Sequence, residues 1–274
     1  MVGAKSPCTE TGGAISSVSR DKRAFEMPAA PTTISPSQQT QIAPTEAAGD
    51  SQDNGMWNST IGLKIVVAAS GVLLLLFVVG HMVGNLQVFL GPDVFNAYGE
   101  KLRMFPALLW VARAGIALAA IVHIVATLRL AILNNAARPV AYAKKRSVKA
   151  SLPSRTMVLS GLMLLAFVIY HLAHYTWKIT NPAYQGLVDL HNRPDIYAMV
   201  ISGFSNPLIS LSYVIAMILL GFHLSHGIAS VFQTAGWATT RTLPKYERAA
   251  LIITIVLVGG YVSIPATVLL GIVR

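Results

Sequence analysis

Charged side chains are scarce in this sequence. Asp, Glu, Lys and Arg make up 12% of its 274 residues, about half the share found in an ordinary soluble domain. No charged residue lies between Lys64 and Asp93, and none lies between Arg155 and Lys178. These long uncharged stretches exclude a typical soluble fold and indicate an integral membrane protein.

Acidic residues and cysteine are scarcer still. The chain has 11 acidic residues against 21 Lys and Arg, a formal net charge of +10. Basic loops flanking membrane spans explain this excess, so we expect no nucleic-acid partner. Cys8 is the single cysteine. One thiol excludes an internal disulfide, and it excludes an iron–sulfur cluster held by this chain's cysteines alone.

Large apolar residues are rare at the start of the chain. Residues 1–57 are rich in Ser, Thr, Pro, Gln and Ala. Such a segment cannot bury enough apolar surface to offset its ordering entropy, so we predict a disordered tail. It has no apolar run of the kind that a signal peptide needs. We therefore divide the chain into a tail, 1–57, and a transmembrane domain, 58–274.

Long apolar runs are what the rest of the chain does have. A membrane-spanning helix needs about 20 mostly apolar residues. Five stretches meet this requirement, at approximately 62–89, 106–134, 156–178, 207–234 and 249–272. The fold class that follows is an all-α membrane protein with five transmembrane helices. The stretch DIYAMVISGF, ahead of Pro207, is read as a short interfacial segment rather than a sixth span.

Basic residues predict the orientation of these spans. The connection 134–155 holds six of them and the connection 235–248 holds three more: Arg138, Lys144, Lys145, Arg146, Lys149, Arg155, Arg241, Lys245 and Arg248. The opposite connections mix fewer basic residues with Asp and Glu. Because basic loops stay in the cytoplasm, we expect a cytoplasmic N-terminus and an external C-terminus in a bacterial cytoplasmic membrane.

Six of the seven histidines fall within the predicted spans, at two depths. His81 follows Lys64 by 17 residues and His171 follows Arg155 by 16, which places both about 24–26 Å from the inner basic ends of their helices. His123 and His223 lie about ten and nine residues before the inner ends of their own spans, at a depth of roughly 14 Å. We call His81 and His171 the outer pair, and His123 and His223 the inner pair.

Each pair joins two alternate helices that run in parallel, so its members would face each other diagonally across a four-helix bundle. A low-spin haem iron takes one imidazole nitrogen from each side of the ring. The two levels therefore predict two bis-histidine b haems within a bundle of the first four spans. Glycines accompany the ligands, at Gly80, Gly84, Gly115, Gly161 and Gly227. A flat macrocycle needs such small neighbours, although close helix packing would also explain them.

Two further histidines lie one helical turn from a predicted ligand. His174 follows His171, and His226 follows His223. Either could bond a haem propionate or line a quinone pocket, or be an interfacial histidine bonded to water or backbone. From position alone, either could also replace its neighbour as the ligand. Arg129 is assigned to a haem propionate, with extension of its side chain to the membrane surface as the alternative.

Three segments together resemble one protein family. They are HMVGNLQVFLGPDVFNAYGEKLR, SRTMVLSGLMLLAFVIYHLAHYTW and HLSHGIASVFQTAGW. The chain from Gly62 to Val273 is similar to the single-chain, five-helix cytochrome b subunit that anchors succinate dehydrogenase and fumarate reductase (complex II) in the membrane. The resemblance implies that the inner pair holds the haem nearer the cytoplasm and the outer pair the distal haem. The spacing of four residues from His223 to Gly227 favours His223 over His226 as a ligand.

The resemblance also implies partners and a reaction. A soluble flavoprotein and an iron–sulfur subunit would dock on the cytoplasmic face, and the succinate site would be theirs. Electrons from succinate would then reach a membrane quinone, menaquinone or ubiquinone, through this chain. Quinone contacts are sought among Arg129, Ser225 and His226 near the inner face and Asn85, Gln87, His174 and Tyr175 near the outer face. Asn85 and Gln87 are better explained as hydrogen bonders at the end of a helix. The residues alone do not choose between the two faces.

Three other functions compete with this interpretation. The chain could be the cytochrome b subunit of another quinone-linked dehydrogenase, although those usually have four spans. It could be an anchor of the same complex without haem, or one whose histidines share an iron–sulfur cluster with a partner. A proton-relay transporter is disfavoured, because no acidic residue lies within the five predicted spans.

Overall fold

The computed structural model describes residues 55–137 and 155–274. The predicted tail lies outside these residues except for 55–57, and so does most of the basic connection between the second and third spans. The regular elements among the described residues are all helices, with a single isolated bridge between Val188 and Pro194 and no strand.

Five helices in the described part are long and apolar enough to cross a membrane. They are α1 (Thr60–Leu86, continued by η2, Gln87–Leu90), α3 (Pro106–Ala136), α5 (Met157–His171, continued by the π-helical turn η3, Leu172–Thr176), α7 (Pro207–Thr234) and α8 (Leu243–Leu269). Shorter elements connect them, namely α2 (Pro92–Arg103), η4 (Pro182–Tyr184) and α6 (Ile196–Phe204). The predicted all-α fold with five spans is confirmed.

Local sequence explains where these helices begin. Proline occupies the first turn of α2, α3 and α7, where its missing N–H costs no helical hydrogen bond. The Asn206 side chain caps α7 by accepting from the backbone N–H groups of Leu208 and Ile209. Asp195 caps α6 in the same way, through the N–H of Ala198.

The fifth span begins earlier than predicted. Hydropathy places its start near residue 249, but α8 begins at Leu243. Its first two turns carry Lys245, Glu247 and Arg248, so one acidic residue does lie within this helix. The position of the membrane boundary does not coincide with the end of the helix, because a helix continues into the polar interface when its residues permit.

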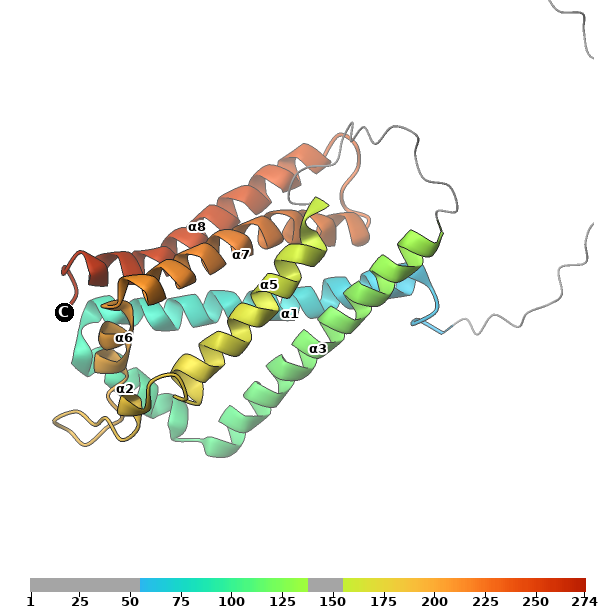
Figure 1. Ribbon diagram of the computed structural model, residues 1–274. Helices are drawn as coiled ribbons and strands as arrows, with labels where there is room; N and C mark the ends of the chain where they lie inside the picture. Colours follow the sequence, from blue (N-terminus) through green and yellow to red (C-terminus); the bar gives the residue numbers. More distant parts are fainter. Residues whose placement is uncertain (1–54, 138–154) are drawn as a thin grey trace, which may run out of the picture. The chain divides into compact units, whose positions relative to one another are not determined.

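The spans pack as two helix pairs with one additional helix. In Figure 1, α7 runs beside α8, and α5 crosses α7 obliquely; α3 packs against α1, which also contacts α7 and α8. The helices α3 and α5 touch over only a short stretch. The first four spans thus form a four-helix bundle, with α8 packed outside it against α7 and α1.

The end of the bundle where α2 and α6 lie, called here the α2/α6 end, has a compact apolar core. Seven buried side chains from η2, α2, α6, α7 and α8 meet there: Val88, Phe95, Val200, Phe204, Tyr213, Ile264 and Val268. Elsewhere the spans expose large apolar side chains along their length. That pattern is expected of helices that face lipid.

A buried polar network fastens the loops at the α2/α6 end. The Asn96 side chain on α2 is fully buried, donates to Asp189 and Asp195 at 3.3 and 3.0 Å, and accepts from the backbone N–H of Tyr197. Arg193 donates to Asp189 at 2.7 Å. Burial would raise the pKa of the Asp189 carboxyl, but hydrogen bonds, chiefly from Arg193, outweigh it and hold that pKa below its ordinary value. The carboxylate is therefore ionised at neutral pH.

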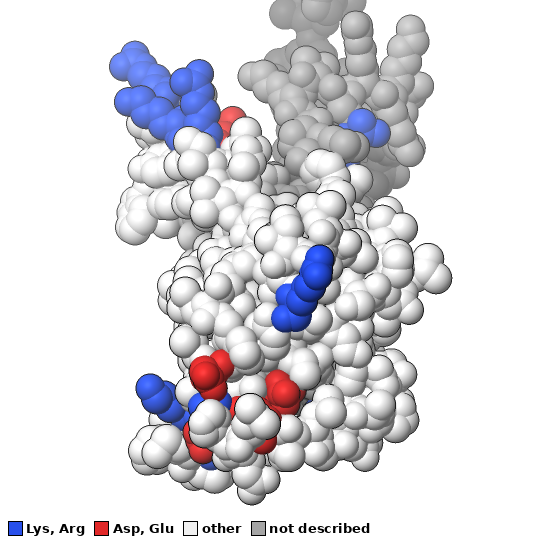
Figure 2. Space-filling view, turned by 90° about the vertical axis from the view of Figure 1, so that its left-hand side faces the viewer, with Lys and Arg blue, Asp and Glu red and all other residues white. Residues whose placement is uncertain are grey.

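Charge on this side of the molecule is confined to small areas. Figure 2 shows acidic side chains gathered in its lower part, beside basic ones, with most of the visible face uncharged. Arg193 also bonds Asp93 at 2.9 Å, which ties the loop before α6 to the first turn of α2. These contacts hold α2 and α6 together over one end of the bundle.

Candidate functional site

The four predicted ligands meet in two pairs across the bundle. His81 on α1 lies 5.9 Å from His171, the last residue of α5, measured between ring centres, and the rings are inclined at 83°. His123 on α3 lies 6.3 Å from His223 on α7, with the rings at 67°. The structure thus brings together the members of the outer pair and the members of the inner pair.

Both rings of the inner pair are held at the Nδ1 nitrogen. His123 Nδ1 lies 3.2 Å from the Ser70 hydroxyl and 3.2 Å from the carbonyl oxygen of Val67, both on α1. His223 Nδ1 lies 3.3 Å from the Ser160 hydroxyl on α5. A metal-binding histidine usually donates its second ring N–H to such a partner, which sets the ring's tautomer and direction. The arrangement leaves Nε2 of each ring for another ligand.

Two glycines give the inner rings their space. A Cβ atom on Gly71 would lie 3.2 Å from Cε1 of His123, and one on Gly161 would lie 3.4 Å from Cε1 of His223. Gly161 was among the glycines expected beside the ligands, whereas Gly71 was missed. Gly80, Gly115 and Gly227 have open space at the Cβ position, and Gly84 instead makes room for the Tyr98 ring.

The outer pair is held differently. His171 Nδ1 lies 3.3 Å from the Tyr213 hydroxyl on α7, and His174 Nδ1 lies 3.0 Å from the same oxygen. The His174 ring is 1% exposed and packs against the rings of Tyr175 and Tyr170, with centres 4.0 and 5.7 Å away. On α1, the Asn85 amide donates to the carbonyl oxygen of His81 and lies within 3.4 Å of its ring nitrogens.

These pairs fit a bis-histidine haem. Two imidazoles that bind one metal from opposite sides, each through a nitrogen about 2 Å from it, have ring centres about 6 Å apart. Both pairs meet that requirement. Within residues 55–137 and 155–274, no group of three or more His, Cys, Asp or Glu side chains could hold a metal ion. The donor set suits a cofactor that brings its own equatorial nitrogens and takes only two protein ligands.

Two of the three remaining candidates near the inner pair have other hydrogen-bond partners. Arg129 is exposed, and its guanidinium donates to the Asn58 side chain at 2.8 Å, ahead of α1. The Ser225 hydroxyl donates to the carbonyl oxygen of Phe222 in its own helix. His226 is half-buried on α7.

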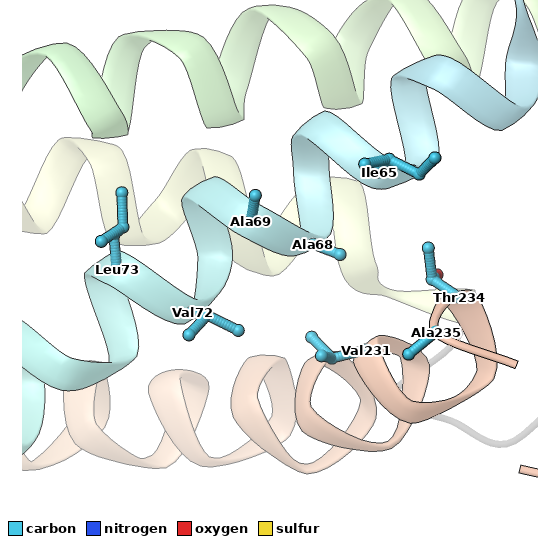
Figure 3. Close-up of a pocket in the computed structure, with 8 residues that line it drawn as sticks. All are labelled: Ile65, Ala68, Ala69, Val72, Leu73, Val231, Thr234 and Ala235. Atoms are coloured by element: carbon cyan, nitrogen blue, oxygen red, sulfur yellow. The ribbon is translucent and has the colours of Figure 1, made fainter. Parts of the chain in front are cut away.

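Two surface grooves could admit an apolar ligand. The larger one, about 540 Å³, lies between α1 and α7 and has apolar walls except for Thr234 (Figure 3). Its α1 wall includes Ala68 and Ala69, neighbours of Val67 and Ser70 that contact His123. The smaller one, about 360 Å³, lies between η2 and α2 and is lined by Gln87, Asp93, Val94, Ala97, Tyr98 and Lys101. Gln87 thus lines a groove, whereas Tyr175 lies inside the aromatic packing around His174.

Sequence reasoning missed the side chains that hold the ring nitrogens. Ser70, Ser160 and Tyr213 are polar residues within apolar spans, and that is the signal that could have identified them. A polar side chain in a lipid-facing helix needs a partner, and each of these contacts a predicted ligand.

Comparison with known proteins supports one family. Residues 135–261 match the family model of the succinate dehydrogenase/fumarate reductase transmembrane subunit. Neither the curated proteins nor the solved structures compared with the chain gave a match. The matched range contains α5, α6, α7 and most of α8, and with them His171 and His223, one predicted ligand from each pair. Just under half of this five-helix integral membrane chain is therefore similar to the succinate dehydrogenase/fumarate reductase transmembrane subunits, which supports the family expected from the sequence.

Proposed function

We propose that this chain is the cytochrome b anchor of a succinate:quinone oxidoreductase, and that it conducts electrons from the soluble subunits to a membrane quinone. His81 and His171 would hold one b haem, and His123 and His223 the other. The observation that carries the proposal is the meeting of four histidines from four helices in two pairs, with ring centres 5.9 and 6.3 Å apart.

The protein's own residues would hold and orient the cofactor. Ser70 and Val67 direct the His123 ring, Ser160 directs that of His223, and Tyr213 directs that of His171. When bound, a haem iron supplies reversible one-electron transfer. Each pair would hold its haem through two histidines, so the bound haem would supply electron transfer rather than oxygen binding. The pairing with His81 favours His171 over His174 as the ligand, since His174 is enclosed by tyrosines.

The partners would bind at the end opposite α2 and α6. Arg241, Lys245 and Arg248 lie there, at the loop before α8 and its first turns. If the positive-inside rule holds for this chain, this is the cytoplasmic face. Basic side chains would then meet acidic surfaces of the iron–sulfur and flavoprotein subunits, which would carry the succinate site and the reaction on succinate.

The quinone would bind in the smaller groove, between η2 and α2. Gln87, Tyr98 and Lys101 provide hydrogen-bond donors for quinone oxygens, and Asp93 provides an acceptor for a quinol. The larger groove between α1 and α7 has only the Thr234 hydroxyl and suits an acyl or isoprenoid chain better than a quinone ring. Ser225 and His226 are the alternative contacts, near the inner pair.

An optical spectrum tests the proposal. The purified complex should give a reduced-minus-oxidised spectrum with a b-type band, and His223→Ala should remove the inner haem while most of the outer signal remains. The reason is that α7 supplies a ligand to the inner pair only. Absence of any b-type band would leave a haem-free anchor, and selective loss of the outer signal would reverse the assignment of the pairs.

A further inference from the structure

A single phenol oxygen lies between the two histidines at the end of α5. Tyr213 projects from α7, is 7% exposed, and has its hydroxyl 3.3 Å from His171 Nδ1 and 3.0 Å from His174 Nδ1. Phe167 and Phe204 pack edge-on against its ring, each with centres 5.0 Å apart. The phenol is therefore held in place by packing as well as by its hydrogen bonds.

The positions of the hydrogens determine which atom donates in each of these two hydrogen bonds. If His171 binds iron through Nε2, its Nδ1 carries a hydrogen and must donate, so the Tyr213 oxygen accepts. The phenol hydrogen is then available to His174 Nδ1, which accepts it. His174 in turn carries its own hydrogen on Nε2.

The His174 side chain is buried more deeply than is expected of a polar residue without a structural or functional role. Its Nε2 has no hydrogen-bond partner among the described residues, and the ring is 1% exposed. Burying an imidazole with one nitrogen unpaired costs free energy. What the burial achieves in this structure is a fixed acceptor for the Tyr213 hydroxyl.

We infer that Tyr213 is a positioning residue for the outer haem, and that His174 acts through it as the third member of the hydrogen-bond series His171, Tyr213, His174. The inference rests on the proposed function, and it gives the outer pair a phenol and a second imidazole where the inner pair has serine hydroxyls that donate to backbone carbonyls. A phenol that donates onward becomes a stronger acceptor, because hydrogen bonds in a chain polarise one another. His171 then becomes a more basic ligand, which favours ferric iron and lowers the midpoint potential of the outer haem.

The test compares haem midpoint potentials in the purified complex. Tyr213→Phe keeps the ring and its packing but removes the hydroxyl. We expect the midpoint potential of the outer haem to rise. The preference for ferric over ferrous iron should fall threefold to tenfold, and a tenfold change corresponds to about 59 mV for one electron. The inner potential should stay the same, since the nitrogens of that pair contact serines instead.

Tyr170→Phe is the matched control. Tyr170 stacks on His174 and packs edge-on against Tyr213, so this variant removes one hydroxyl from the same aromatic cluster. Both potentials should be unchanged. If Tyr213→Phe loses the outer haem, the inference is tested with a fluorotyrosine incorporated at position 213. This residue keeps the hydroxyl but makes it a weaker hydrogen-bond acceptor. The outer potential should then rise by less than the shift expected for Phe.

Two results would overturn the inference while leaving the proposed function intact. One is an outer potential that does not move when the hydroxyl is removed or made more acidic, with both haems present. The other is an equal shift of both haems, which would indicate a general change in the bundle. Absence of haem from the unmodified complex would instead remove the proposed function and this inference together.

Discussion

At the scale of single residues, the histidines illustrate what counting along a helix can and cannot predict. The rise of 1.5 Å per residue fixes depth, so positions alone matched His81 with His171 and His123 with His223. The direction around each helix axis, and the tilt between helices, are not contained in the count. For that reason Ser70, Ser160 and Tyr213, which hold the ring nitrogens, could not be predicted as partners of particular histidines.

The glycine beside His123 allows a test of how tightly the inner site is built. Gly71→Val places a branched side chain where a Cβ alone would lie 3.2 Å from the imidazole. Metal sites tolerate ligand displacements of about 0.5 Å, so we expect inner haem content to fall by roughly half or more, measured as haem per protein with the two signals resolved.

A lipid-facing glycine provides the comparison. Gly259 on α8 has open space at its Cβ, so Gly259→Val should leave both haems in place. An equal loss in the two variants would mean that helix propensity, rather than contact with His123, causes the effect.

At the scale of elements, hydropathy predicted all five spans and missed what happens at their ends. The helix α2 lies in a stretch that was treated only as a connection, and the start of α8 was placed six residues late. Both differences have one cause, since a helix at the membrane interface needs no apolar run. The π-helical turn that ends α5 was not predicted either. It is a local widening of the helix, which the hydrophobic periodicity of the sequence does not indicate.

The groove between η2 and α2 depends on these unpredicted elements. Gln87→Leu should raise the KM for quinone severalfold while both haem spectra stay normal, because the amide would contact a quinone oxygen and the substitution preserves side-chain size. Steady-state quinone reduction by the intact complex measures this. Ser225→Ala serves as the comparison, and a KM that rises only in that variant would move the quinone to the inner pair.

At the scale of the whole molecule, the charge distribution and the two histidine levels describe one axis through the membrane. The outer pair lies toward the end closed by α2, α6 and the Asn96 network, and the inner pair lies toward the end with the basic loop before α8. Electrons entering at the basic end would meet the inner pair first. A quinone bound at the α2/α6 end would make turnover move electrons across the membrane, in a direction set by which end faces the cytoplasm.

Labelling of introduced cysteines determines this orientation. In a Cys8→Ser background the chain has no thiol, so a single new cysteine reports one position. Leu190 is fully exposed at the α2/α6 end, and Thr240 is exposed in the loop before α8. In intact cells, a membrane-impermeant maleimide should label Leu190→Cys but label Thr240→Cys only after permeabilisation. The reverse pattern would place the basic loop outside, which would leave the soluble subunits without a docking face in the cytoplasm and contradict the proposed direction of electron flow.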